Sequence, residues 1–124
     1  MLALTDPHEA YRRSQIDARV AGGRAGDLVL ICVGEVVDNL GAAIRAHYGH
    51  HLAARSKGLT RALTALTALE MGVDRQAPLA GALLQLYGAA RERLLDSAVR
   101  FDADAMDEVR GDFRDLRDAF GGAR

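Results

Sequence analysis

The sequence predicts an all-α protein: an antiparallel up-down four-helix bundle preceded by a short N-terminal arm. Ala (23), Leu (17) and Gly (13) fill 53 of the 124 positions, whereas Val, Ile and Thr together number only 15. Ala and Leu favour helix, and the scarcity of β-branched residues leaves too few to build several strands. Apolar residues also recur every three or four positions along four segments, which is the period of a helix with one buried face. A chain of this length holds one domain with a single core.

Glycine-rich breaks divide the chain into an arm and a bundle. The stretch 21–26 is too rich in glycine for a helix interior, so we expect an arm over 1–24, the bundle over 25–121 and a tail over 122–124. Inside the arm, Asp6-Pro7 resembles a helix start, because Asp caps a helix and Pro fits its first position. A short helix over residues 7–13 is therefore expected.

The first two bundle helices are expected over 27–48 and 51–71, ended by Gly49 and Gly72. The buried row of the first helix has spacings of three and four: Val29, Val33, Val36, Leu40 and Ile44. The second helix repeats every seven residues, through Leu52, Leu59, Leu66 and Val73.

The third and fourth helices are separated by an acidic break at residues 102–104. The third is expected to open with Pro78 in its first turn and to bury Leu79, Leu83, Leu86, Ala90, Leu94 and Phe101. The fourth carries the cleanest row, which comprises Met106, Val109, Phe113, Leu116 and Phe120, and Gly121-Gly122 closes it. Because the connections are short, neighbouring helices must be antiparallel.

Charge and cysteine content exclude several classes of partner. The chain has 16 basic and 17 acidic residues, so it lacks the excess of cations that nucleic-acid binding requires. A single cysteine, Cys32, forms no intramolecular disulfide and fits a reducing compartment. The longest apolar run, 28–33, is far shorter than the span of about 20 residues that crosses a membrane. We expect a cytoplasmic protein without a signal peptide, membrane insertion or nucleic-acid binding.

The histidines form the one cluster with metal-ligand spacing. His47 and His51 stand four positions apart on the expected helix face, with His50 beside them, but no Cys or carboxylate lies within six residues. We interpret them as solvated residues at a turn, not as a metal site. A histidine phosphotransfer bundle that uses His51 or His47 is the alternative, although Lys57-Gly58 follows His51 by six residues where that motif has two or three.

Other catalytic groupings are missing. Cys32 lies inside an apolar run, where an inert buried thiol is expected. The carboxylates of the fourth helix alternate with arginines, which is typical of surface ion pairs. We therefore predict no enzymatic activity, no catalytic residue, no metal and no cofactor.

The first and third helices carry more apolar surface than one core requires. The run 28–33 continues around the helix, so Leu28 and Ile31 fall away from the buried row. The third helix has a second row of Leu84, Tyr87 and Leu95. Spacing alone leaves two explanations equally open: the arm or a homodimer covers this surface, or a groove receives a partner segment.

Several residues in the last two helices resemble the FliS family of flagellin export chaperones. They are Leu79-Ala80, Leu83, Leu86-Tyr87, Arg93-Leu94, Asp102, Glu108-Val109 and Leu116-Arg117-Asp118-Ala119-Phe120. The final stretch is similar to a family signature of Leu-Arg-Asp-Ala followed by an aromatic residue. Ala10-Tyr11 and Gly26-Asp27-Leu28 resemble the N-terminal half of the family, so the resemblance spans about residues 10–120.

The resemblance implies a cytoplasmic chaperone that binds the C-terminal segment of flagellin and prevents premature polymerisation. It also implies delivery to the flagellar type III export apparatus, through an FlhA-like gate component, and an N-terminal arm that covers part of the groove until the client displaces it. An amphipathic client would cover the surplus apolar surface. We expect the contacts with flagellin at Tyr11, Ile31, Leu59, Leu63, Leu84, Tyr87 and Leu95. A structural homo-oligomer remains a further alternative.

Overall fold

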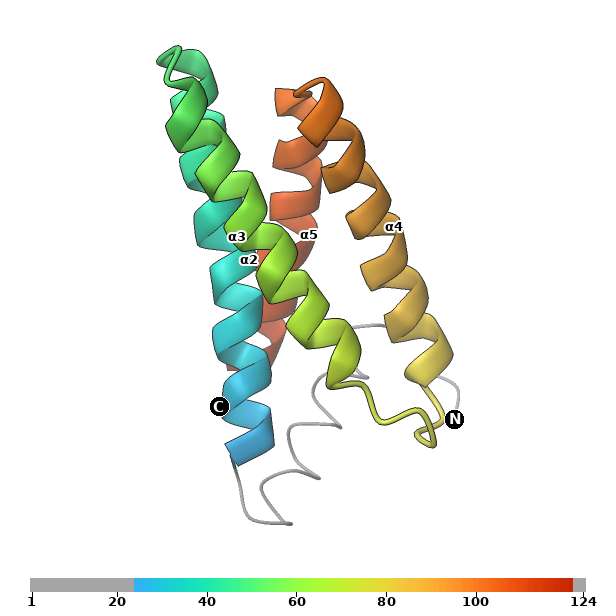
Figure 1. Cartoon of the computed structure of the whole chain (residues 1–124). Helices are drawn as coiled ribbons and strands as arrows, with labels where there is room; N and C mark the ends of the chain where they lie inside the picture. Colours follow the sequence, from blue (N-terminus) through green and yellow to red (C-terminus); the bar gives the residue numbers. More distant parts are fainter. Residues whose placement is uncertain (1–23, 122–124) are drawn as a thin grey trace.

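The computed structural model describes residues 24–121, which form four helices (Figure 1). They are α2 (Arg24–Tyr48), α3 (Leu52–Met71), α4 (Ala80–Val99) and α5 (Ala103–Gly121), and this part of the chain contains no strand. Each of α2 and α4 packs against both α3 and α5, and consecutive helices run in opposite directions. The predicted antiparallel four-helix bundle is confirmed. The expected arm, its short helix over 7–13 and the tail fall outside the described residues.

The core lies between apolar rows of all four helices, and the predicted rows of α2 and α5 supply much of it. Val33, Val36 and Leu40 are buried on α2, as the spacing predicted. On α5 the buried residues are Met106, Val109, Phe113 and Leu116. The row predicted for α3 is only partly right, because Leu59 and Leu66 are buried whereas Leu52 is 64% exposed. Leu52 is the first residue of its helix, where the chain has just left the turn and faces solvent.

The beginnings of α2 and α4 differ from expectation. The glycine-rich stretch does not delay α2, which begins at Arg24 with Gly26 buried and Asp27 in its first turn. Pro78 lies before α4, whose N-cap is Leu79. The delay has a local cause, since the side chain of Asp74 accepts a hydrogen bond from the Gln76 amide (3.0 Å) and holds the chain in a turn.

The α4–α5 connection comprises residues 100–102 and thus lies two residues before the predicted break at 102–104. Arg100 adopts an extended backbone and ends α4, so Phe101 belongs to the connection and not to the helix. The Ala105 amide donates to Oδ1 of Asp102 (3.0 Å), which caps the first turn of α5. The acidic break predicted at 102–104 therefore includes the cap of the last helix.

A left-handed residue ends α2. The His51 amide donates to the Ala46 carbonyl (2.8 Å) and the His50 amide donates to the His47 carbonyl (3.1 Å), which is the Schellman pattern. The left-handed position is His50, with φ of 59°, and not the neighbouring Gly49 that the sequence suggested as the stop.

Replacement of His50 by Gly should stabilise the protein, because glycine adopts this backbone without the steric cost that an L side chain carries. We expect the free energy of unfolding in urea to rise by about 0.5–1 kcal/mol. His51→Gly, at a position with φ of −102°, is the matched control and should give no gain. Equal effects of the two substitutions would contradict this account of the turn.

Helices α2 and α3 form the most extensive helix pair, and their backbones come close together at Gly58. A Cβ atom at Gly58 would lie 2.8 Å from the Asn39 carbonyl oxygen and 3.0 Å from the Ala43 amide nitrogen. Both neighbours are backbone atoms, which no rotamer change can move. Gly58 is therefore required by the packing of the two helices, although glycine lowers the intrinsic stability of a helix.

Gly58→Ala should destabilise the bundle by about 1–3 kcal/mol, because the two backbones must separate to admit the methyl group. Gly88→Ala is the matched control, since Gly88 lies inside α4 and a Cβ there meets nothing within 4 Å. That substitution should instead stabilise by about 0.5–1 kcal/mol through helix propensity. Thermal unfolding followed by circular dichroism measures both, and a stabilising Gly58→Ala would refute the close contact.

Candidate partner-binding surface

The predicted contact residues differ widely in exposure. Ile31 on α2 is 58% exposed and Leu95 on α4 is 48% exposed, so both are open to a partner. Leu63 on α3 and Leu84 on α4 are half-buried. Tyr11 falls outside the described residues. Four of the seven expected contacts therefore have side-chain surface that a partner can reach.

Leu59 and Tyr87 lie in the core. Tyr87 is 1% exposed, and its ring stacks beside Phe113 with 6.3 Å between the ring centroids. Burial raises the pKa of the Tyr87 phenol. Tyr87 lies four positions after Leu83 and seven before Leu94, both buried, so it belongs to their row and not to the outer row of Leu84 and Leu95.

Two exposed apolar pairs stand out on opposite members of the bundle. Leu28 and Ile31 form the α2 pair, with exposures of 61% and 58%. Leu95 and Val99 form the α4 pair, one helical turn apart, with exposures of 48% and 90%. The apolar run 28–33 predicted that Leu28 lies away from the buried row. The exposure of Val99 could not be predicted, because Val99 is the last residue of its helix, where the apolar periodicity ends.

Further apolar side chains are exposed at the ends of helices. They are Tyr48, Leu52 and Met71, with exposures of 67%, 64% and 80%. Within residues 24–121, exposed apolar surface is thus distributed over several elements.

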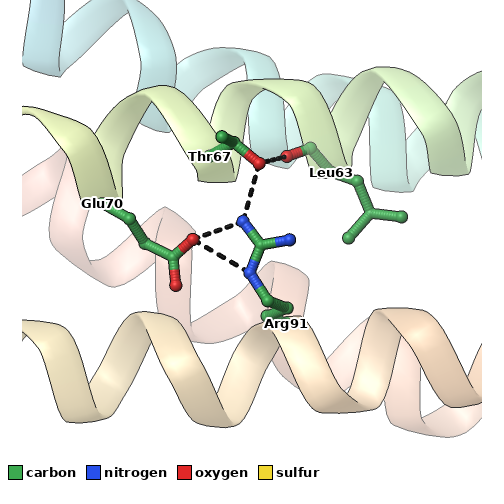
Figure 2. A network of polar contacts seen from close by, with 4 residues as sticks. All are labelled: Leu63, Thr67, Glu70 and Arg91. Carbon is green, nitrogen blue, oxygen red and sulfur yellow. Dashed lines mark hydrogen bonds and ion pairs between the residues drawn. The ribbon is translucent and has the colours of Figure 1, made fainter.

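A polar network joins α3 to α4 beside the half-buried Leu63 (Figure 2). The Arg91 guanidinium donates from Nε to Oε1 of Glu70 (2.9 Å) and from Nη2 to Oγ1 of Thr67 (2.6 Å), and Nη2 also contacts Glu70 Oε1. Thr67 in turn donates to the Leu63 carbonyl (3.0 Å). The hydrogen bond that Arg91 donates to the Glu70 carboxylate raises the pKa of Arg91. The sequence could not indicate this network, because its partners are more than 20 residues apart.

The histidine cluster is divided between packing and solvent. Arg55 Nη1 donates to Nδ1 of His47 (3.1 Å), and the His47 ring lies 4.8 Å from the Phe101 ring, centroid to centroid. His50 and His51 are exposed in the turn, as expected. Within residues 24–121, no three His, Cys, Asp or Glu side chains are grouped so that they could hold a metal.

Cys32 is half-buried beside the α2 pair. Partial burial raises the pKa of its thiol, and the negative charge of Glu35 raises it further. Because the thiolate is the reactive form, this environment favours an unreactive thiol.

A comparison with protein-family models decides the identity of the family. The model of flagellar protein FliS matches residues 7–124 of the chain. The chain belongs to the FliS family. The resemblance in the sequence is thereby confirmed over nearly the whole length. No curated protein matches the chain.

FliS is a family of flagellar export chaperones and not of enzymes. None of the four helices is long and apolar enough to cross a membrane, within the residues that the structure describes.

The thiol of Cys32 should react more slowly with iodoacetamide at pH 8 than the thiol of a short unstructured peptide, because its raised pKa leaves less thiolate. Glu35→Gln removes a negative charge, lowers the pKa of the thiol and should speed the reaction at the same pH. The rate of alkylation followed against pH measures both effects. If Glu35→Gln leaves the pH dependence of the alkylation rate unchanged, the Glu35 carboxylate has no influence on the pKa of the Cys32 thiol.

Proposed function

We propose that this FliS chain binds the C-terminal segment of flagellin in the cytoplasm, prevents its premature polymerisation and delivers it to the flagellar type III export apparatus. An FlhA-like gate component is the proposed receiver. The observation that carries the proposal is the exposure of the α2 pair and the α4 pair in a member of a flagellar export chaperone family. Exposed apolar clusters of this kind mark surfaces where a partner docks.

The separation of the two pairs indicates what form the client takes. Helices α2 and α4 are diagonal members of the bundle, because each packs mainly against α3 and α5. A compact client or a single short helix cannot cover both pairs. A segment that is unordered before binding can wrap around the bundle and lay separate apolar stretches on each pair. The ordering cost moderates the affinity, which suits a chaperone that must release its client.

The half-buried residues of the predicted set have a supporting place in this proposal. Leu63 and Leu84 supply apolar surface on α3 and α4 that a wrapping segment can contact. Leu59 and Tyr87 contribute by shaping the core beneath that surface. A homodimer and phosphotransfer through a histidine are the alternatives. For phosphotransfer through His47, the Nδ1 atom of that ring is already in contact with Arg55.

Replacement of Ile31 or Leu95 by Asp should weaken binding of a C-terminal flagellin fragment by at least about tenfold, or 1.4 kcal/mol, because each places a charge on an apolar contact. Thr60→Asp, at an exposed position of α3, is the control and should bind like the unmodified protein. Isothermal titration measures affinity, and circular dichroism should show unchanged helicity in all three variants.

The proposal fails if no complex forms at micromolar concentrations, or if removal of the C-terminal segment of flagellin leaves binding unchanged. Sedimentation of the chain alone distinguishes a homodimer from a monomeric chaperone. A mass that grows with concentration and returns to that of a monomer in Ile31→Asp would assign the α2 pair to self-association.

A further inference from the structure

A hollow of about 360 Å³ lies between α2 and α5, and arginines dominate its lining. The lining residues, which we call the arginine hollow, are Val37, Asp38, Gly41, Arg45, Arg110, Arg114 and Arg117. Four guanidinium groups thus face one carboxylate, although the whole chain has a net charge of −1. Positive charge is concentrated here against the overall balance of the protein.

Two of the guanidinium groups converge above Gly41. A Cβ atom at Gly41 would lie 3.2 Å from Nη1 of Arg45 and 3.8 Å from Nη1 of Arg110, so the missing side chain leaves room at the floor. Asp107 orients Arg110 through a contact of 2.8 Å to Nη2, which leaves Nη1 directed at the hollow.

The other charges are only partly compensated. Nη1 of Arg117 lies 3.6 Å from Oδ1 of Asp38, and the Asp38 side chain is 75% exposed. Arg45 and Arg114 are exposed and form no ion pair among the residues that the structure describes. Like charges that converge in this way repel one another, and a bound anion removes the repulsion.

The arrangement of the arginines indicates an extended anion. Arg110, Arg114 and Arg117 follow one face of α5 at spacings of four and three, so they are distributed over about 10 Å of helix. A single small oxyanion would meet only part of this row. The planar fork of each guanidinium matches a carboxylate in two-point contacts.

We propose that the arginine hollow binds a short acidic segment of a protein partner, through the side-chain carboxylates of its Asp and Glu residues. Two exposed carboxylates on α5 lie beside the row: Asp107, which pairs with Arg110, and Asp118, one helical turn after Arg114. They repel a long polyanion such as a nucleic acid, whereas a short acidic segment ends before it reaches them. The site differs in chemistry from the apolar pairs proposed for flagellin.

A labelled peptide of alternating Glu and Ala, with a Gln-and-Ala peptide as its neutral control, tests the site by fluorescence anisotropy with the full chain. The Glu peptide should bind, more weakly as salt is added, and the Gln peptide should not. The double variant R45Q/R114Q should weaken binding by at least about fivefold. The control variant R61Q/R75Q removes two exposed arginines outside the hollow and should change the affinity for the Glu peptide by less than about twofold.

Equal weakening in the two double variants would overturn the proposal, because it would show only general charge attraction. Displacement of the peptide by millimolar inorganic phosphate, or tighter binding of a short single-stranded oligonucleotide lost in the same variant, would assign the hollow to another anion and also overturn it. Circular dichroism checks folding, and R114Q alone serves if the double variant unfolds. Leu95→Asp should bind the peptide normally, which separates this result from the flagellin test.

Discussion

The close approach of α2 and α3 at Gly58 is the constraint on which the arrangement of the bundle depends. Backbone atoms of α2 occupy the space that a side chain at Gly58 would need, and the small buried residue Ala43 lies beside them. The large side chains, Tyr87 and Phe113 among them, therefore fill the space toward α4 and α5. Small residues on one side of the core and aromatic rings on the other give the bundle its asymmetry.

That asymmetry leaves α4 less closely packed than α2 against α3, as the wider separation of the ribbons in Figure 1 illustrates. The contact between α3 and α4 combines apolar packing with the ion pair between Arg91 and Glu70. Such a partly exposed pair adds specificity of position more than stability. Its effect is to fix α4 beside α3 while the outer face of α4, with Leu95 and Val99, stays open.

The sequence predicted what depends on local periodicity and missed what depends on pairing between helices. The row of α5 was assigned correctly from Met106 to Leu116, because most of the other positions are charged, whereas the side chain of Phe120 falls outside the described part of the chain. Tyr87 was placed on the outer row because two apolar rows of α4 lie side by side, and only packing against Phe113 decides between them. The Arg91 network and the arginine hollow join residues far apart in the chain. No local spacing could have revealed them, and the same holds for exposure at helix ends such as Val99.

In the proposed function, the buried core of this FliS chain stays in place while a wrapping client covers its outer surface. Methyl resonances of the chain, titrated with the C-terminal segment of flagellin, test this claim most directly. The account predicts that the methyl signals of Ile31, Leu95 and Val99 shift, while those of Leu40 and Leu66, which are fully buried, stay in place. Shifts confined to the buried methyls, or none at saturating client, would contradict it.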